Sequence, residues 1–471
     1  MLDEVLMATN GKFQFFLAFL CALASFIDAA EVSMMGLLYP TLKKEFNLTE
    51  SQLALVPSLT YAGMFLGAIG FGKLSDLYGR KYTFMASMFI CSFFGLLSSF
   101  ASNVVVFSLL RLFLGIGYGG NLVTSTTLLI EFVSHEKRGI FVMLTAVGFG
   151  MGAIVISGVS WAVIPSLGWR WLIRIAAFMA VPAFVLLVFV PESPRFYIMT
   201  HQFEKCVETM EFVAQVNGKS LDHTFNATTL AVVHHEDHTR DISWRTCWGM
   251  KQMWRRSIMV TLLPLAACWF LNAFANVLNN WIPFHANLQF PNRHDVPFVV
   301  GLIQASGLLF GTIIQLLVVP YIGRLFQLRT GFFSCALLVL FLGLFGLSSY
   351  TTICVLAFML QVVEQLVIGT LYLYTPEVFP TALRVTAFGI CQANHRVAPI
   401  IAPYAIAGLD SISFNVTCYV FSGLFLLGLV CSLFVRITTF NKPLVEESDL
   451  LQPHEEVHDK NKSFDEALVH M

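Results

Sequence analysis

Charged residues are scarce in this chain of 471 residues, because Asp, Glu, Lys and Arg make up only 12% of it. Soluble domains usually carry about 25%. The formal net charge of −1 provides no basic surface for nucleic acid. No G-x-x-x-x-G-K-[ST] loop occurs, which argues against an ATP-driven pump. The ten Cys show neither C-x-x-C nor Cys/His ligand spacing, so we expect no metal site and no disulfides. No pattern indicates an enzyme or a cofactor.

Apolar residues, in contrast, make up 56% of the chain. A helix that crosses a bilayer needs about 20 mainly apolar residues. Twelve segments are of this kind, namely 13–38, 52–74, 82–101, 104–128, 139–163, 171–190, 258–284, 297–320, 330–348, 351–374, 386–408 and 416–437. The sequence therefore predicts an all-α membrane protein with 12 transmembrane helices in a lipid bilayer.

One long polar stretch divides these segments into two sets of six. The predicted parts are a cytosolic N-terminus (1–12), a six-helix bundle (13–190), a cytosolic central linker (191–257), a second six-helix bundle (258–437) and a cytosolic tail (438–471). Lys and Arg number 16 in the loops on the linker's side of the membrane and 4 on the opposite side. Because positive residues favour the cytosol, we place both termini and the linker there.

A pattern of charged residues occurs twice, about half a chain apart. Each copy has a Gly-Arg pair and, further on, a Glu followed seven residues later by an Arg. The members are Asp76, Gly79, Arg80, Glu131 and Arg138 in the first half, and Gly323, Arg324, Glu377 and Arg384 in the second. Repeated ion-pair formers at the same ends of apolar segments indicate two similar halves, a plan common among transporters. Pro320 stands in the place of Asp76, so we expect the second network to be weaker.

These motifs resemble those of a known family. The stretch from Gly72 to Lys81 (GKLSDLYGRK) is similar to the loop signature of the major facilitator superfamily. The stretches 111–120, 131–139, 191–196 (PESPRF) and 375–384 (TPEVFPTALR) resemble further motifs of its sugar and organic-ion porters. The resemblance implies a transporter whose repeated Arg and Glu residues form cytosolic ion-pair networks that open and close as the halves rock. A simpler role, anchoring helix ends at the headgroups, remains open.

The first apolar segment carries Asp28 and Glu31, three residues apart on one helix face. Carboxylates are costly in a membrane, so both should face a cavity or a partner. The segment resembles the first helix of synaptic-vesicle-2-related proteins, which are relatives of the organic cation and anion transporters. By resemblance to proton-coupled members we expect Asp28 to pair with Arg111, and protonation to loosen the pair. A permanent structural bridge is the alternative.

The second half carries different polar residues inside its apolar segments. Asn272, Asn276 and Asn279 form a stripe on one helix face, and Glu364 lies in the tenth segment. Amides there suit a substrate, although hydrogen bonds between packed helices explain them equally well. The eleventh segment contains His395 and Arg396. By resemblance to organic-anion transporters, Arg396 would bind a substrate carboxylate; pairing with Glu364 or Asp28 is the alternative.

The tail contains Glu446, Leu450 and Leu451, which resemble an acidic dileucine signal read by adaptor proteins. The membrane is therefore predicted to be the plasma membrane or that of an endosome, lysosome or secretory vesicle. We expect a secondary transporter of a small organic ion, more readily an anion, with protons as the candidate coupling ion. An organic-cation or sugar porter and a non-transporting vesicle membrane protein are the alternatives.

Overall fold

The computed structural model describes residues 2–134, 137–220, 226–230, 256–293, 295–318, 321–379, 381–435 and 437, and every element named within them is a helix. The first half contains α2 (Lys12–Phe46), α3 (Glu50–Tyr78), α4 (Arg80–Ser98), α5 (Val104–Phe132), α6 (Arg138–Leu167) and α7 (Trp169–Val188). The second half contains α12 (Arg256–Gln289), α13 (Val296–Val318), α14 (Arg324–Phe345), the 3-10 turn η2 (Gly346–Ser348), α15 (Tyr350–Val378), α16 (Thr381–Asp410) and α17 (Phe414–Phe434).

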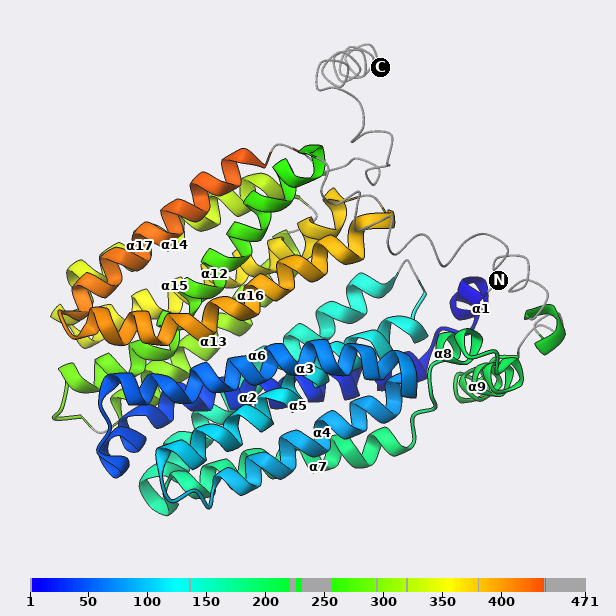
Figure 1. Cartoon of the computed structure of the whole chain (residues 1–471), viewed down its shortest axis with the longest axis horizontal. Helices are drawn as coiled ribbons and strands as arrows, with labels where there is room; N and C mark the ends of the chain where they lie inside the picture. Colours follow the sequence, from blue (N-terminus) through cyan, green and yellow to red (C-terminus); the bar gives the residue numbers. More distant parts are fainter. Residues whose placement is uncertain are drawn as a thin grey trace, which may run out of the picture.

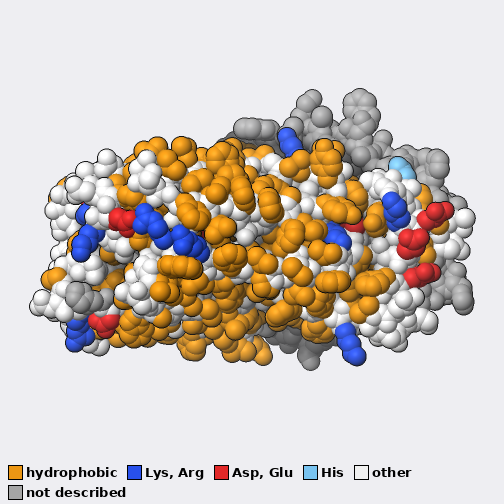
Figure 2. All heavy atoms as spheres, turned by 90° about the horizontal axis from the view of Figure 1, so that it is seen from below, with side chains coloured by type: hydrophobic (Ala, Val, Ile, Leu, Met, Phe, Trp, Pro, Cys, Tyr) orange, Lys and Arg blue, Asp and Glu red, His pale blue; other side chains and the backbone are white. Residues whose placement is uncertain are grey.

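Eleven of the described helices are long and apolar enough to cross a membrane. The remaining long helix, α16, has 30 residues and contains the polar residues Gln392, Asn394, His395 and Arg396. Hydrophobic side chains cover the middle of the molecule, and most of the charged side chains in this view lie toward its two ends (Figure 2). This distribution is that of a protein whose middle contacts lipid.

The helices form two bundles that repeat one packing plan (Figure 1). Helix α2 packs on α6 as α12 packs on α16, and α3 packs on α5 as α13 packs on α15. Helix α4 likewise packs on α7 as α14 packs on α17. The bundles meet through α3 with α16 and α6 with α13. The predicted pair of six-helix bundles is confirmed.

Glycines allow the closest helix contacts in the first bundle. A Cβ on Gly63 or Gly67 would come within 2.0 Å of a backbone oxygen of α5, and one on Gly115 or Gly119 within 2.2 Å and 2.0 Å of α3. Two small-xxx-small patterns therefore face each other, which is a common way for helices to associate in lipid. This packing fixes α5, which carries Arg111 and Glu131, against α3.

Short helices lie at one end of the molecule, named here the linker end because it carries the start of the central linker (Figure 1). They are α1 (Leu2–Ala8), α8 (Pro194–Met199) and α9 (Phe203–Val216). Leu6 of α1 packs on Cys206 and Met210 of α9. Asn217 accepts a hydrogen bond from the backbone N–H of Phe13 at 2.8 Å, which ties α9 to the start of α2. The opposite end is called the far end.

Candidate functional site

Helices α2 and α5 are joined inside the first bundle by a buried ion pair. Arg111 Nη1 donates to Glu31 Oε2 at 2.6 Å, and the two side chains are 1% and 3% exposed. Arg111 also lies over the ring of Phe107, with its Cζ 5.0 Å from the ring centroid. The expected Asp28–Arg111 pair is therefore wrong. Glu31 lies three residues after Asp28, which is nearly one helical turn further along α2. This places Glu31, and not Asp28, at the level of Arg111.

Asp28 of α2 contacts a different residue of α5. Asn121 Nδ2 of α5 donates to Asp28 Oδ1 at 2.7 Å, and both residues are buried. Arg396 of α16 interacts electrostatically with Asp28, so the charges of the two bundles meet here. Arg396 is half-buried, and no carboxylate of the described residues forms an ion pair with it. The sequence left Glu364 and Asp28 as possible partners of Arg396, and the structure places Arg396 near Asp28.

Aromatic rings lie beside Arg396. Trp269 of α12 is fully buried, and its ring contacts Tyr372 at 4.9 Å, His395 at 5.4 Å and Phe388 at 6.1 Å between centroids. Trp269 Nε1 donates to Thr375 Oγ1 at 2.9 Å, which holds the indole in place. Tyr372 is partly exposed and interacts electrostatically with Arg396. Arg396 therefore lies beside aromatic rings, close to the interface between the two bundles.

The second bundle has its own buried carboxylate. Glu364 Oε2 of α15 accepts hydrogen bonds from Nδ2 of Asn276, at 3.0 Å, and of Asn279, both on α12. Gln304 of α13 donates to the Asn279 backbone oxygen at 3.1 Å. Asn272 is 1% exposed, and its side-chain atoms have no hydrogen-bond partner among the described residues. Of the three residues in the predicted Asn stripe, Asn276 and Asn279 reach Glu364, and Asn272 does not.

A small cavity of about 20 Å³ adjoins the Glu31–Arg111 pair, enough for about one water molecule. Its lining includes Tyr61 and Tyr118 of the first bundle and Asn280 of the second. Arg111 Nε and Nη2 are buried and have no hydrogen-bond partner among the described residues. The surface of the cavity is mostly apolar, so it offers few polar partners to a water molecule.

The bundles are closed against each other on the far-end side of this cavity. A Cβ on Gly36 of α2 would lie 2.8 Å from the backbone oxygen of Asn280 of α12. Tyr39 packs on Trp281, with ring centroids 5.3 Å apart, and Lys43 lies over the Phe284 ring at 5.1 Å. Toward the linker end the ribbons of the two bundles diverge (Figure 1). The residues around Arg396 and Asp28 thus lie on the inner side of a closed far end.

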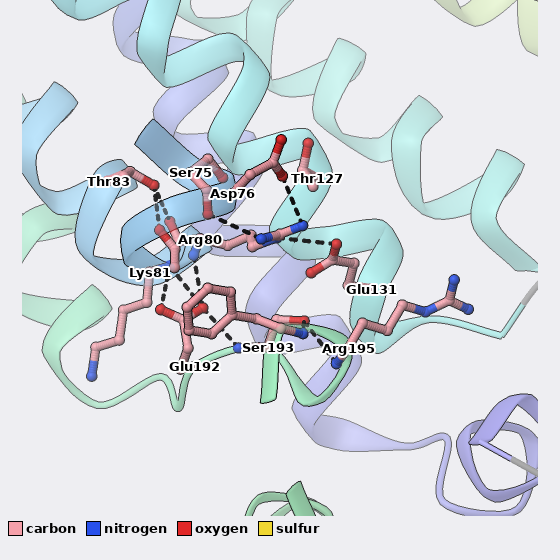
Figure 3. Close-up of polar contacts among 12 residues, drawn as sticks. Ser75, Asp76, Arg80, Lys81, Thr83, Thr127, Glu131, Glu192, Ser193 and Arg195 are labelled. Carbon is pink, nitrogen blue, oxygen red and sulfur yellow. Dashed lines mark hydrogen bonds and ion pairs between the residues drawn. The ribbon is translucent and has the colours of Figure 1, made fainter. Parts of the chain in front are cut away.

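The first copy of the repeated charge pattern forms a compact cluster at the linker end (Figure 3). The guanidinium of Arg80 contacts Glu131 at 3.2 Å, Asp76 at 3.1 Å and the backbone oxygen of Ser75 at 3.0 Å. Arg80 is buried, whereas Asp76 is largely exposed. All of these residues belong to the first bundle, so in this conformation the cluster joins α3, α4 and α5 to one another.

Glu192 completes this cluster and was not among the expected site residues. Its Oε1 accepts hydrogen bonds from the backbone N–H groups of Arg80 at 2.9 Å, Lys81 at 3.1 Å and Ser193 at 2.8 Å. A carboxylate at these N–H groups stabilises the start of α4, where the helix dipole is positive. Gly79 has φ of +99° and makes room for it. The PESPRF motif was the signal that pointed to Glu192.

The second copy of the charge pattern also forms an ion pair. Arg324 Nη2 contacts Glu377 Oε1 at 3.5 Å, and both side chains are more exposed than those of Arg80 and Glu131. The longer distance and greater exposure agree with a weaker second pair. Arg138 Nε donates to the backbone oxygens of Ile130 at 3.1 Å and Val133 at 3.4 Å, closing the end of α5. The side chain of Arg384 and the tail residues Glu446, Leu450 and Leu451 lie outside the described residues.

Two bundles with one packing plan, joined by a central polar interface, define a secondary transporter of the major facilitator fold. The chain belongs to the family described as sugar (and other) transporter, whose model matches residues 7–450. Among solved structures, it is similar to the xylose transporter XylE from E. coli in a partially occluded inward open conformation. The TM-score is 0.74 at 16% identity, over 92% of this chain and 99% of that one.

Several curated proteins are similar along most of their length. The synaptic vesicle 2-related protein of Rattus norvegicus is 29% identical over 466 residues, covering 93% of this chain and 81% of the relative. The organic cation/carnitine transporter 7 of Arabidopsis thaliana is 27% identical, covering 86% and 88%. The niacin transporter NiaP of Acinetobacter baylyi is 28% identical, covering 84% and 87%. The two transporters among these relatives are named for different substrates.

Proposed function

We propose that this transporter moves a small organic anion with a carboxylate group, and that Arg396 binds the carboxylate. The observation that carries the proposal is the half-buried guanidinium of Arg396, which no described carboxylate neutralises through an ion pair. A guanidinium binds a carboxylate through two parallel hydrogen bonds. A partly buried guanidinium that no ion pair neutralises is costly, which favours a role in binding substrate.

The rings around Arg396 support an anion with an apolar or aromatic body. Tyr372, Phe388 and His395 surround Trp269 next to the guanidinium. Ring stacking adds about 0.5–1.5 kcal/mol per pair beyond burial. The relative named as a niacin transporter agrees with this class, since niacin is an aromatic carboxylate.

We further propose that Asp28 carries a proton during transport. Asp28 and the substrate carboxylate would compete for Arg396, because the guanidinium already interacts with Asp28. When the substrate takes over Arg396, Asp28 would bind a proton in its place, and the two events would be coupled. The Glu31–Arg111 pair, which is fully buried, would hold α2 and α5 together throughout.

The organic-cation alternative has its own support. Asp28, Glu31 and Glu364 are buried carboxylates, and one relative is named as an organic cation/carnitine transporter. Glu31 is neutralised by Arg111, however, and Glu364 is held by two amides. Asp28 is therefore the carboxylate that a cation would meet, with Arg396 opposing it. A sugar porter, as the family description allows, would need neither charge.

Uptake into proteoliposomes tests the proposal, with a panel of aromatic and aliphatic carboxylates, organic cations and sugars. We expect carboxylate uptake, and Arg396→Ala should lower it by roughly 10- to 150-fold, because a hydrogen bond to a charged group contributes about 1.5–3 kcal/mol. Asp28→Asn should remove the response to an imposed pH gradient. Arg293→Ala, in a far-end loop where Arg293 lies over Tyr350, is the matched control. Uptake of cations or sugars alone would overturn the proposal.

A further inference from the structure

The outer face of α7 carries a charged residue in line with apolar ones. Its exposed large side chains recur every three or four residues, which is the spacing of one helix face. They are Trp171, Phe178, Val181, Val185 and Val188. Arg174 is half-buried and lies in the same stripe, less than two turns after Trp169, where α7 begins. Because an exposed apolar face of a membrane-spanning helix contacts lipid, Arg174 is a cation on a lipid-facing surface.

Arg174 is held in place by the end of α4 and by its own helix. Its Nε donates to Ser99 Oγ at 3.2 Å. Its Cζ lies 4.8 Å from the ring centroids of both Phe100 and Trp171, which are 65% and 48% exposed. Aromatic rings beside a basic residue near a helix end are typical of the membrane–water interface. Arg174 therefore lies at the depth of the lipid headgroups at the far end.

No carboxylate of the described residues balances the charge of Arg174. Arg170, one turn earlier on α7, pairs with Glu45, and Trp169 also donates to that carboxylate. Nη1 and Nη2 of Arg174 form no hydrogen bond with any residue that the structure describes, and neither atom is enclosed by protein. A charge on a lipid-facing helix is costly unless it reaches a polar partner. The partner of these two Nη groups must come from the surroundings of the protein.

We propose that Arg174 binds the phosphate group of a phospholipid in the far-end leaflet. The two Nη groups suit two phosphate oxygens, because the planar guanidinium donates parallel hydrogen bonds. Ser99 and the two rings already fix the side chain, so little conformational freedom is lost on binding. The exposed rings of Phe100 and Trp171 offer apolar surface to the rest of the lipid. The site lies apart from Arg396 and Asp28 and goes beyond the proposed transport function.

A structural role for Arg174 would have a different signature. Ser99 ends α4, and a cation there also balances the partial negative charge at a helix C-terminus. That role stabilises the protein whether or not a phospholipid is bound. The two roles are therefore separated by measuring the dependence on lipid.

The test uses the full-length protein, purified in detergent and stripped of lipid. Phosphatidylcholine is titrated in, and the bound lipids are counted by native mass spectrometry. Arg174→Gln should weaken the tightest phosphatidylcholine site roughly tenfold or more, since it removes hydrogen bonds from a charged group. Diacylglycerol with the same acyl chains lacks the phosphate and should not fill the site. Inorganic phosphate at matched concentration should not displace the lipid.

Two further variants accompany Arg174→Gln. Arg293→Gln is the matched control, because Arg293 also lies over a ring, that of Tyr350 at 5.1 Å, but in a loop between helices. It should bind phosphatidylcholine as the wild type does. Ser99→Ala keeps the guanidinium and removes the hydrogen bond that orients it, so it should weaken binding by less than Arg174→Gln.

The melting temperature with and without phosphatidylcholine completes the test. We expect the lipid to raise it in the wild type, because a ligand of the folded state stabilises that state, and to raise it less in Arg174→Gln. Equal lipid binding in Arg174→Gln and the wild type would overturn the proposal. So would equal filling by diacylglycerol, displacement by inorganic phosphate, equal weakening in Arg293→Gln, or a loss of stability in Arg174→Gln that is the same with and without lipid.

Discussion

Arg111 of α5 pairs with Glu31 of α2 at 2.6 Å, while Asp28, one turn earlier on α2, bonds to Asn121. The two carboxylates of one helix face therefore have separate environments. Glu31 forms a neutral pair inside the first bundle. Asp28 faces Arg396 across the interface between the bundles. Asp28 interacts with the opposite bundle, so a substrate bound between the bundles can change its environment. Glu31 is neutralised within its own bundle and is less accessible to such a change.

The Glu31–Arg111 pair predicts a large loss of stability when one partner is removed. Glu31→Gln leaves the guanidinium buried without a carboxylate, and we expect it to lower the free energy of unfolding by about 3–5 kcal/mol. Chemical unfolding of the purified protein measures it. The matched control is Glu50→Gln, which breaks the partly exposed Lys43–Glu50 pair and should cost less than about 1 kcal/mol. Equal losses in the two variants would contradict the assignment.

The contact between Gly36 and Asn280 predicts how to open the far end. Gly36→Val places a Cβ 2.8 Å from the Asn280 backbone oxygen, so α2 and α12 must separate there. We expect faster labelling of a Val32→Cys probe, which lines the adjoining cavity, by an impermeant thiol reagent added on the far-end side. Gly158→Val is the control, because nothing lies within 4 Å of its Cβ position. An unchanged labelling rate would show that this contact does not hold the far end closed.

The linker-end cluster predicts coupling between Gly79 and Glu192. A Cβ on Gly79 would lie 2.2 Å from Glu192 Oε2, at a φ of +99°. Gly79→Ala should cost about 1–3 kcal/mol for the backbone strain alone, and Glu192→Ala about 1–3 kcal/mol for the N–H groups that it leaves unpaired.

Because Glu192→Ala also removes the clash, the double variant should lose less stability than the sum of the single variants. Gly72→Ala on α3, where nothing lies within 4 Å of the added Cβ, should be neutral or slightly stabilising. Thermal unfolding of the four variants in detergent checks this. Stability losses that add strictly in the double variant would show that Gly79 and Glu192 are not coupled.

The two bundles share a plan but place their buried acids differently. In each half the first and fourth helices, α2 with α5 and α12 with α15, are joined by buried polar contacts. In the first half Asp28 and Glu31, the acids that make these contacts, lie on the first helix, and in the second half Glu364 lies on the fourth. The repeated packing and the unequal chemistry agree with halves that move as equivalent bodies and bind different groups.

The sequence by itself determined the architecture. Long apolar segments allow only helices in a bilayer, since every backbone N–H and C=O must be paired within the segment. The repeated pattern of Arg80, Glu131, Arg324 and Glu377 then predicted two similar halves, and the structure joins both pairs. These features follow from composition and spacing, which require no knowledge of how helices rotate about their axes.

The tertiary structure alone decided which polar side chains meet. Asp28 and Glu31 share one helix face, so spacing could not tell which of them reaches Arg111, and a small rotation or shift of α2 against α5 decides it. Only the packing of α12 on α15 shows that Asn279 binds Glu364, and only the path of the linker shows that Glu192 binds the N-terminus of α4. Buried polar contacts depend on distances of a few tenths of an ångström between helices far apart in the chain. Close packing sets those distances, and no local pattern of residues encodes them.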